Sequence, residues 1–188
     1  MWIKMKNYYK RIDGKVFPID IVDNRIYVYD LYITELVTNV QYEYIDCSNN
    51  LWKELHLPDS CRGVDCQYNQ LKELILPDGC KVVCCYDNQL KELIIPAGCK
   101  VVYCYDNQLK ELIIPDGCET VNCSNNQLTE LIIPNGCKKV SCENNQLKEL
   151  VIPDGCECIE ADMKSVTELN KVKELYLCIW KVIIKRLQ

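Results

Sequence analysis

The sequence predicts a mostly β fold in which short coils of extended chain stack into a solenoid. One unit recurs end to end with a period of 19 residues, and it is cleanest between Cys99 and Cys118, which read CKVVYCYDNQLKELIIPDGC. Core-facing and outward residues alternate around Val102, which is the period of a strand. The rest of the unit, LKELIIP, leaves no room for an α-helix before the next turn. We therefore expect one short strand and one extended return segment in each coil.

The repeat divides the chain into three parts. Residues 1–22 do not fit the repeat, and the turn pair Asp13-Gly14 between β-prone residues predicts a hairpin that caps the first coil. Residues 23–171 hold eight coils, whose strands are expected to pair in parallel at ~4.8 Å. Residues 172–188 are predicted to form a truncated last coil and a C-terminal cap.

Each coil follows the consensus CxxVxCxxNxLxxLxIP, in which positions 1, 4, 6, 9, 11, 14 and 16 are predicted to face the core. The Asn at position 9 can bond backbone groups that the turn after the strand leaves unpaired. These asparagines are predicted to stack as a structural ladder: Asn50, Asn69, Asn88, Asn107, Asn126 and Asn145. Pro-x-Gly sequences, from Pro77–Gly79 to Pro153–Gly155, are predicted to close the coils, with Pro fixing φ and Gly supplying a positive φ.

The segment VxCxxNQLKEL, as in Val102–Leu112, resembles the leucine-rich-repeat signature LxxLxLxxNxL with cysteine at its sixth place. The resemblance covers residues 23–171, and these short cysteine-containing coils are similar to leucine-rich repeats of bacterial and viral proteins. It implies a right-handed solenoid with a parallel strand sheet on its concave face and non-helical return segments. It also implies that the concave face binds another protein, although a fold does not fix a role.

The chain holds 15 cysteines, most of them at positions 1 and 6 of the repeat. Pairs such as Cys61 and Cys66 have a C-x4-C spacing, unlike the C-x2-C pairs of common zinc sites, and His56 is the sole histidine. We interpret these cysteines as small apolar core residues in a reducing compartment, with no metal, no cofactor and no catalytic residue. Cys84 and Cys158 are predicted to face outward and are the candidates for reactive thiols.

Charge and hydropathy argue against two classes of partner. The net charge is −5, with 22 basic and 27 acidic side chains interspersed, so the chain lacks the concentrated basic face that nucleic-acid binding needs. No apolar run approaches the ~20 residues that span a bilayer, and the N-terminus has no signal-peptide pattern, so no membrane contact is expected. These observations predict a cytoplasmic protein, or one in a host cytoplasm if it is an effector or a viral protein.

The outward positions of the middle strands are expected to form a binding face. Stacking the coils gathers aromatic and apolar residues in one patch with acids around it, which is typical of a protein-binding hot spot. The patch comprises Tyr68, Val82, Cys84, Tyr86, Val101, Tyr103 and Tyr105, and the acids are Asp46, Asp65, Asp87 and Asp106. It predicts a non-enzymatic module that binds another protein. The competing explanation is that Tyr and Val simply suit a strand surface.

Position 15, on the return segment, gives a second outward row if that segment alternates regularly. Its members are Ile75, Ile94, Ile113, Ile132 and Val151. Monomers seldom tolerate an exposed apolar stripe, so either the row is a self-association surface of a homodimer or structural assembly, or the return segment is rotated and the row is partly buried. We favour rotation. A host-targeting, effector-like binder is the other functional alternative.

Overall fold

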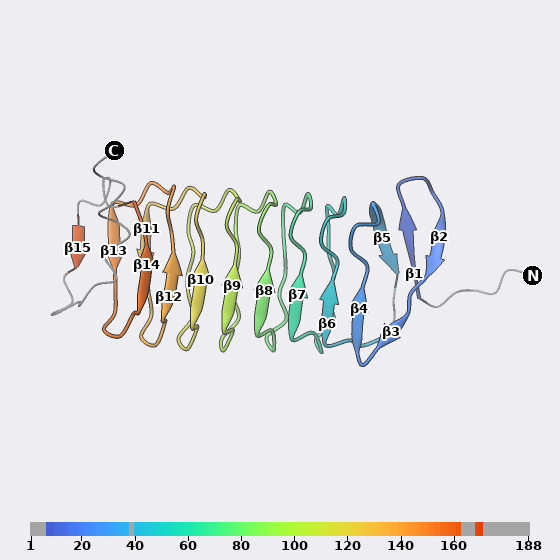
Figure 1. Ribbon diagram of the computed structural model, residues 1–188, viewed down its shortest axis with the longest axis horizontal. Helices are drawn as coiled ribbons and strands as arrows, with labels where there is room; N and C mark the ends of the chain where they lie inside the picture. The colour runs from blue at the N-terminus through green and yellow to red at the C-terminus, as the bar shows by residue number, and fades with distance from the viewer. Residues whose placement is uncertain (1–6, 38–39, 163–167, 171–188) are drawn as a thin grey trace, which may run out of the picture.

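The computed structural model describes residues 7–37, 40–162 and 168–170. Figure 1 shows the coils standing side by side along the long axis of the molecule, with the N-terminal hairpin at one end. The described residues contain no helix, so the prediction of a mostly β solenoid with extended return segments is confirmed. The predicted last coil and cap over residues 172–188 lie outside the described residues.

A 9-stranded sheet forms one long side of the solenoid, and we call its outward surface the front face. All of its strands except β3 (Ile21–Val22) pair in parallel, each one coil after the last. These parallel strands are β4 (Arg25–Tyr27), β6 (Tyr44–Asp46), β7 (Gly63–Asp65), β8 (Val82–Cys84), β9 (Val101–Tyr103), β10 (Thr120–Asn122), β12 (Lys139–Ser141) and β14 (Cys158–Glu160). The central residue of each strand points inward and its neighbours point outward, because side chains alternate along a strand.

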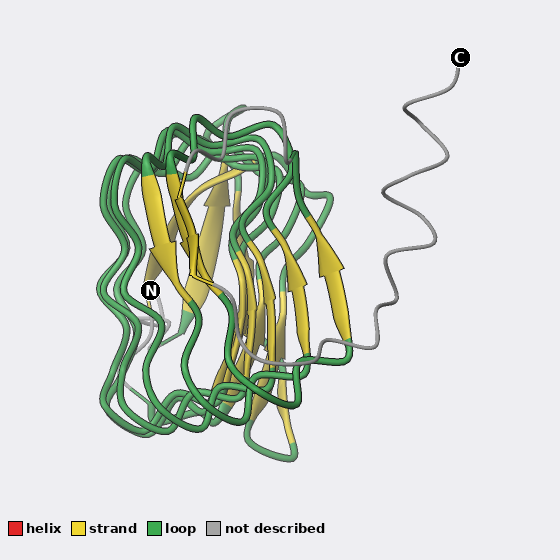
Figure 2. Cartoon of the chain, turned by 90° about the vertical axis from the view of Figure 1, so that its left-hand side faces the viewer, coloured by secondary structure: helices red, strands yellow, loops and turns green. Residues whose placement is uncertain are grey.

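The return segments form the opposite side, which Figure 2 shows when the molecule is viewed along the stack. In the last coils they are the strands β11 (Glu130–Ile132), β13 (Glu149–Val151) and β15 (Glu168–Asn170), paired in parallel. Earlier coils are joined in the same register by single backbone bonds. The N–H of Gln89 donates to the carbonyl of Leu71 at 2.9 Å, for example.

The N-terminal segment adds strands to both sides of the first coil. The strands β1 (Tyr8–Arg11) and β2 (Val16–Pro18) pair as a hairpin around Gly14, whose φ is 80°. Strand β1 also pairs antiparallel with β5 (Ile33–Val37), the first return segment, while β3 pairs antiparallel with β4 in the main sheet. The open core of the first coil is therefore flanked by non-repeat strands on each side.

The preference for a rotated return segment was wrong. Ile75, Ile94, Ile113 and Ile132 are 81%, 85%, 84% and 63% exposed, and only Val151 at the end of the row is partly buried. Alternation along the extended chain explains the result, since the leucine before each isoleucine is buried and the residue after it faces the core. Rotation of the return segment would bury the isoleucines only by exposing both the leucines before them and the core-facing residues after them.

The cysteines occupy the core as two continuous rows. Every described cysteine is a free thiol, and all except Cys84, Cys156 and Cys158 are buried. Burial raises the pKa of Cys66 and Cys104 well above the usual value, so these groups stay as neutral thiols. They pack beside the valines and leucines of the same coils as small apolar side chains.

The position-9 asparagines hold successive coils together through buried hydrogen bonds. In Asn107, Oδ1 accepts from the backbone N–H of Leu90 at 2.9 Å, and Nδ2 donates to the carbonyls of Cys85 at 3.0 Å and Cys104 at 3.2 Å. Asn50, Asn69, Asn88, Asn126 and Asn145 make equivalent bonds. Each amide therefore satisfies groups in its own coil and in the coil before it.

The turns follow the predicted chemistry with one exception. Gly98, Gly117, Gly136 and Gly155 have φ between 80° and 88°, a region that glycine adopts without strain. Gly79 does not share this positive φ, contrary to the prediction. Its lack of a side chain serves a close approach instead, because the guanidinium of Arg62 lies where a Cβ would stand.

Candidate functional site

The predicted patch residues lie together in the middle of the front face. Val82 and Cys84 come from β8, Val101 and Tyr103 come from β9, and the register pairs Val82 with Val101 and Cys84 with Tyr103. The other members sit in the turns that follow the strands: Tyr68 after β7, Tyr86 after β8 and Tyr105 after β9. The strands thus place alternate side chains outward. The turns at the C-terminal ends of the strands add Tyr68, Tyr86 and Tyr105.

Three of these tyrosines pack into a continuous aromatic row, which comprises Tyr68, Tyr86 and Tyr105. The rings of Tyr86 and Tyr105 stack at a centroid distance of 4.1 Å with 12° between their planes. Tyr68 meets Tyr86 edge to face at 5.3 Å and 80°. Such contacts fix the rings in place, so little side-chain freedom is left to lose when a partner binds.

Tyr68 has a backbone conformation that its residue type disfavours. Its φ is 52°, and its side chain is 47% exposed. In six other coils the same position holds Asp or Asn, and these residues also have a positive φ: Asp30, Asn49, Asp87, Asp106, Asn125 and Asn144. Asp and Asn tolerate this region, whereas a bulky residue there is strained. Strain of this kind is concentrated at functional sites. The sequence alone shows that Tyr68 replaces the Asp or Asn that six other coils have at this position, but it does not show the positive φ.

Acidic side chains border the aromatic row. Asp46 and Asp65 are direct neighbours in adjacent strands, and burial followed by the charge of Asp46 raises the pKa of Asp65 to about 6. One carboxylate oxygen of Asp65 is buried and has no hydrogen-bond partner among the described residues. Asp87 and Asp106 follow Tyr86 and Tyr105 in the turns, and burial raises the pKa of Asp87 with help from Asp106.

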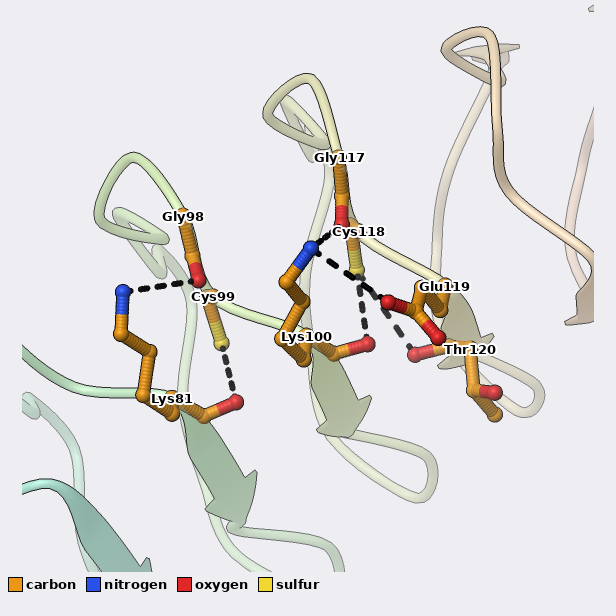
Figure 3. A network of polar contacts seen from close by, with 8 residues as sticks. All are labelled: Lys81, Gly98, Cys99, Lys100, Gly117, Cys118, Glu119 and Thr120. Carbon is orange, nitrogen blue, oxygen red and sulfur yellow. Dashed lines mark hydrogen bonds and ion pairs between the residues drawn. The ribbon is translucent and has the colours of Figure 1, made fainter.

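Cationic side chains lie at the other ends of the strands. Lys81 and Lys100, which immediately precede β8 and β9, donate from Nζ to the carbonyls of Gly98 at 3.2 Å and Gly117 at 3.0 Å (Figure 3). Lys100 also forms an ion pair with Glu119 at 3.3 Å. These lysines are directed toward the chain's own turns. Around β8 and β9 the front face is therefore polarised, with cations where these strands begin and Asp87 and Asp106 in the turns that follow them.

Comparison with solved structures identifies the architecture. YopM from Yersinia enterocolitica WA-314 matches with a TM-score of 0.67 and 24% identity over 71% of this chain and 31% of that one. The functional domain of InlJ from Listeria monocytogenes matches with a TM-score of 0.64 and 21% identity over 70% of this chain and 32% of that one. A Shigella effector leucine-rich-repeat domain gives a TM-score of 0.53 and 21% identity, over 74% and 68%. The fold is that of leucine-rich-repeat proteins.

The chain spans about a third of the length of these YopM and InlJ structures. The InlJ structure is described as including a cysteine ladder, and the buried cysteine rows here are a similar arrangement. No protein-family model and no curated protein matches the chain.

Within the residues that the structure describes, no group of three or more His, Cys, Asp or Glu side chains is placed to hold a metal ion. His56 is exposed on the return side, away from the front face. No helix among the described residues is long and apolar enough to cross a membrane.

The Cys84 thiol differs from the reactive group that its outward position suggested. Burial, followed by the charges of Asp65 and Asp46, raises its pKa to about 12. A thiol with this pKa is almost wholly protonated near neutrality and is a poor nucleophile. Cys158 lies at the start of β14 and is partly buried. On the front face Cys84 therefore acts as a packing residue between the acids and Tyr103.

Proposed function

We propose that this leucine-rich-repeat solenoid is a non-enzymatic module that binds another protein through the middle of its front face. The observation that carries the proposal is the aromatic row, in which a strained Tyr68 extends the stacked pair Tyr86 and Tyr105. Preorganised tyrosines bury a large area at a small entropic cost, which makes them common anchors of protein interfaces. The likeness to other leucine-rich-repeat proteins supports an interaction role at the level of the fold.

The surrounding charges favour a partner with basic residues opposite the aromatic row. Asp87 and Asp106 lie beside the rings, so an Arg or Lys side chain could meet a tyrosine face and a carboxylate together. The same face already contains such a contact, because the guanidinium of Arg25 lies 5.6 Å from the ring centre of Tyr44. Both cation–π contacts found among the described residues lie outside the aromatic row. The row therefore has no cation over it among the described residues, although Tyr86 and Tyr105 cover one face of each other.

We place this activity in a reducing compartment, the cytoplasm of the cell or of a host. The support is that the described cysteines are all free thiols and stand in closely stacked rows. Intracellular conditions keep such thiols reduced. A host location would make the protein an effector-like binder that uses the same face, which is the alternative function.

The test compares tyrosines inside and outside the row. A partner captured by the wild-type protein is purified, and its affinity is measured by calorimetry for wild type, for Tyr86→Ala/Tyr105→Ala and for the control Tyr27→Ala/Tyr29→Ala. Both control tyrosines are exposed on the front face in the first coil, at 49% and 47%. We expect the row variant to lose at least about 30-fold in affinity and the control to stay within about 3-fold. Equal affinities for the two variants would refute the anchor.

A further inference from the structure

Asp46 and Asp65 lie side by side on the front face without a neutralising cation. They are paired in register on β6 and β7, and neighbouring strands lie ~4.8 Å apart, so both carboxylates leave the same surface close together. Neither of the ion pairs found among the described residues includes either of them. Two carboxylates that share a site in this way repel each other, which favours a state in which one of them is protonated.

The two carboxylates differ in their hydrogen bonds. Asp46 is held by its own turn, because its Oδ1 accepts from the backbone N–H of Ser48 at 3.1 Å and from the Ser48 hydroxyl at 2.7 Å. Asp65 accepts from the backbone of Gln67, but its buried Oδ1 has no hydrogen-bond partner among the described residues. A proton on Asp65 would make this carboxyl a donor, and Asp46 is the neighbouring acceptor. Asp46 is therefore suited to stay ionised and Asp65 to take up the proton.

Tyr44 leans from β6 over β7 because Gly63 has no side chain. A Cβ added to Gly63 would stand 2.9 Å from Cδ2 of the Tyr44 ring, whereas the equivalent position carries a side chain in every other coil of the repeat. The ring lies near Asp65 as well, since burial and then the charge of Asp65 raise the pKa of Tyr44 to about 12. Gly63 therefore lets the Tyr44 ring shield Asp65 from solvent.

The other titratable groups beside the two carboxylates are neutral in mildly acidic solution. Cys84 of β8 pairs with Asp65 in register and stays a thiol, because burial and the nearby carboxylates raise its pKa to about 12. Tyr86 in the turn after β8 stays a phenol, since burial raises its pKa. Tyr27 of β4, beside Asp46 in register, is also an uncharged phenol in this range.

Two arginines stand on neighbouring strands but are directed elsewhere. Arg25 of β4 lies over the ring of Tyr44, with its guanidinium 5.6 Å from the ring centre. Arg62, which precedes β7, donates from Nη1 to the carbonyls of Asp59 at 2.9 Å and Cys61 at 3.3 Å. A proton is therefore the group that can relieve the repulsion between the two carboxylates within the described part of the chain.

We propose that Asp46 and Asp65 form a proton switch on the front face: in mildly acidic solution Asp65 takes up one proton and shares it with ionised Asp46, and near neutrality both are ionised. The pKa of Asp65, which burial and then the charge of Asp46 raise to about 6, agrees with this geometry. The native state binds the proton more tightly than the unfolded chain does. The stability that the shared proton confers is therefore complete below the ordinary pKa of an aspartate and is lost as pH rises through about 6.

The switch regulates partner binding, and this part of the inference rests on the proposed function. A basic side chain of the partner that approaches the front face meets both negative charges of the pair near neutrality and only one in mildly acidic solution. Protonation of Asp65 therefore weakens the binding of a cationic partner. By linkage, binding of that partner drives the proton off Asp65.

NMR titration of the aspartate carboxyl carbons in the full chain tests the pair without any partner. We expect Asp65 to titrate near pH 6 in wild type, as its raised pKa of about 6 requires. Asp46→Asn removes the neighbouring charge, while Tyr44→Ala and Gly63→Ala remove or displace the shielding ring, so each should lower the midpoint by at least about one pH unit. Tyr29→Ala is the control, because Tyr29 is exposed on the front face in the first coil, and it should leave the midpoint unchanged. A wild-type midpoint near the ordinary value of about 4, or one that none of the three substitutions moves, overturns the proposal.

Calorimetry tests the regulation, with the affinity of the captured partner measured at about pH 7.5 and about pH 5 for wild type and for Asp65→Asn. The variant cannot titrate at this position, so it corrects for groups of the partner that do. We expect wild type to lose at least about 3-fold more affinity than Asp65→Asn between the two conditions. Equal losses would refute the regulation and leave the proposed function intact. A partner that binds elsewhere would refute the proposed function and leave the NMR titration of Asp65 as it is.

Discussion

The substitution Asn107→Ala tests how much the asparagine ladder contributes to stability. The side chain is 8% exposed and makes hydrogen bonds to groups in two coils. Its carbonyl partners have second donors, because Cys85 also accepts from Asn88 and Cys104 also accepts from Asn126. Leu90 has no such reserve, since the bond to Asn107 is the one found for its buried backbone N–H among the described residues.

The expected loss of stability differs between these partners, because the carbonyls keep a second donor and the N–H of Leu90 keeps no acceptor. Stranding the N–H of Leu90 costs about 1–3 kcal/mol, and losing the bonds from Nδ2 to carbonyls that keep other donors adds roughly 1 kcal/mol. We therefore expect Asn107→Ala to lower the free energy of unfolding by about 2–4 kcal/mol. Gln108→Ala is the matched control, because Gln108 is the next residue, its side chain is exposed and its loss should change stability by less than about 0.5 kcal/mol.

Urea unfolding followed by circular dichroism measures both variants, with unchanged m-values as the check that the same surface unfolds. Amide hydrogen exchange adds a local readout, since the amide of Leu90 should lose protection first in Asn107→Ala. A loss below about 1 kcal/mol, or a Leu90 amide protected as in wild type, would show that the ladder is not a main source of cohesion between coils.

Three further predictions concern single residues of the front face and core. Tyr68→Asn should raise stability by about 0.5–1 kcal/mol in urea unfolding, because Asn accepts the positive φ, and should weaken partner binding in calorimetry. Asp65→Asn should stabilise the fold by about 1–2 kcal/mol at pH 8; the native Asp65 binds its proton near pH 6, so the advantage should shrink as pH falls and vanish below about pH 4. Native protein at pH 8 should react with a thiol reagent far more slowly at Cys104 than urea-unfolded protein does, as peptide mapping would record.

The repeat pattern predicted the buried rows because each buried position has one chemical requirement. Asn107 is needed for its amide, Cys104 fills a small apolar space, and the side chains alternate about Val102. These requirements recur in the six coils that carry Asn50 to Asn145, so the sequence alone was enough to reveal them. The non-helical return segment followed from its length.

The orientation of the isoleucines could not be decided from the sequence. A return segment with apolar residues at consecutive positions fits either alternation, and burying Ile113 looks favourable when it is considered alone. The structure resolves the choice because Leu112 and Ile114 are 7% and 6% exposed and leave the intervening residue outside. Gly79 escaped prediction for a similar reason, since its partner Arg62 lies at the opposite end of the same coil in the sequence.

The candidate site was predictable as a set of residues but not as a geometry. Register placed Tyr86 and Tyr105 in neighbouring coils, yet stacked and tilted rings are equally compatible with that spacing. The pKa values of Cys84 and Asp65 depend on burial and on charges in adjacent strands. A single position in the sequence does not encode either of these.

Hydroxyl-radical footprinting of the protein with and without its partner tests the proposed binding face most directly, because it reports the exposure of individual tyrosine side chains. Tyr68, Tyr86 and Tyr105 should become protected when the partner is bound, while Tyr27 and Tyr29 keep their reactivity. Protection of Tyr27 and Tyr29 with no change in the aromatic row would contradict binding at the middle of the front face.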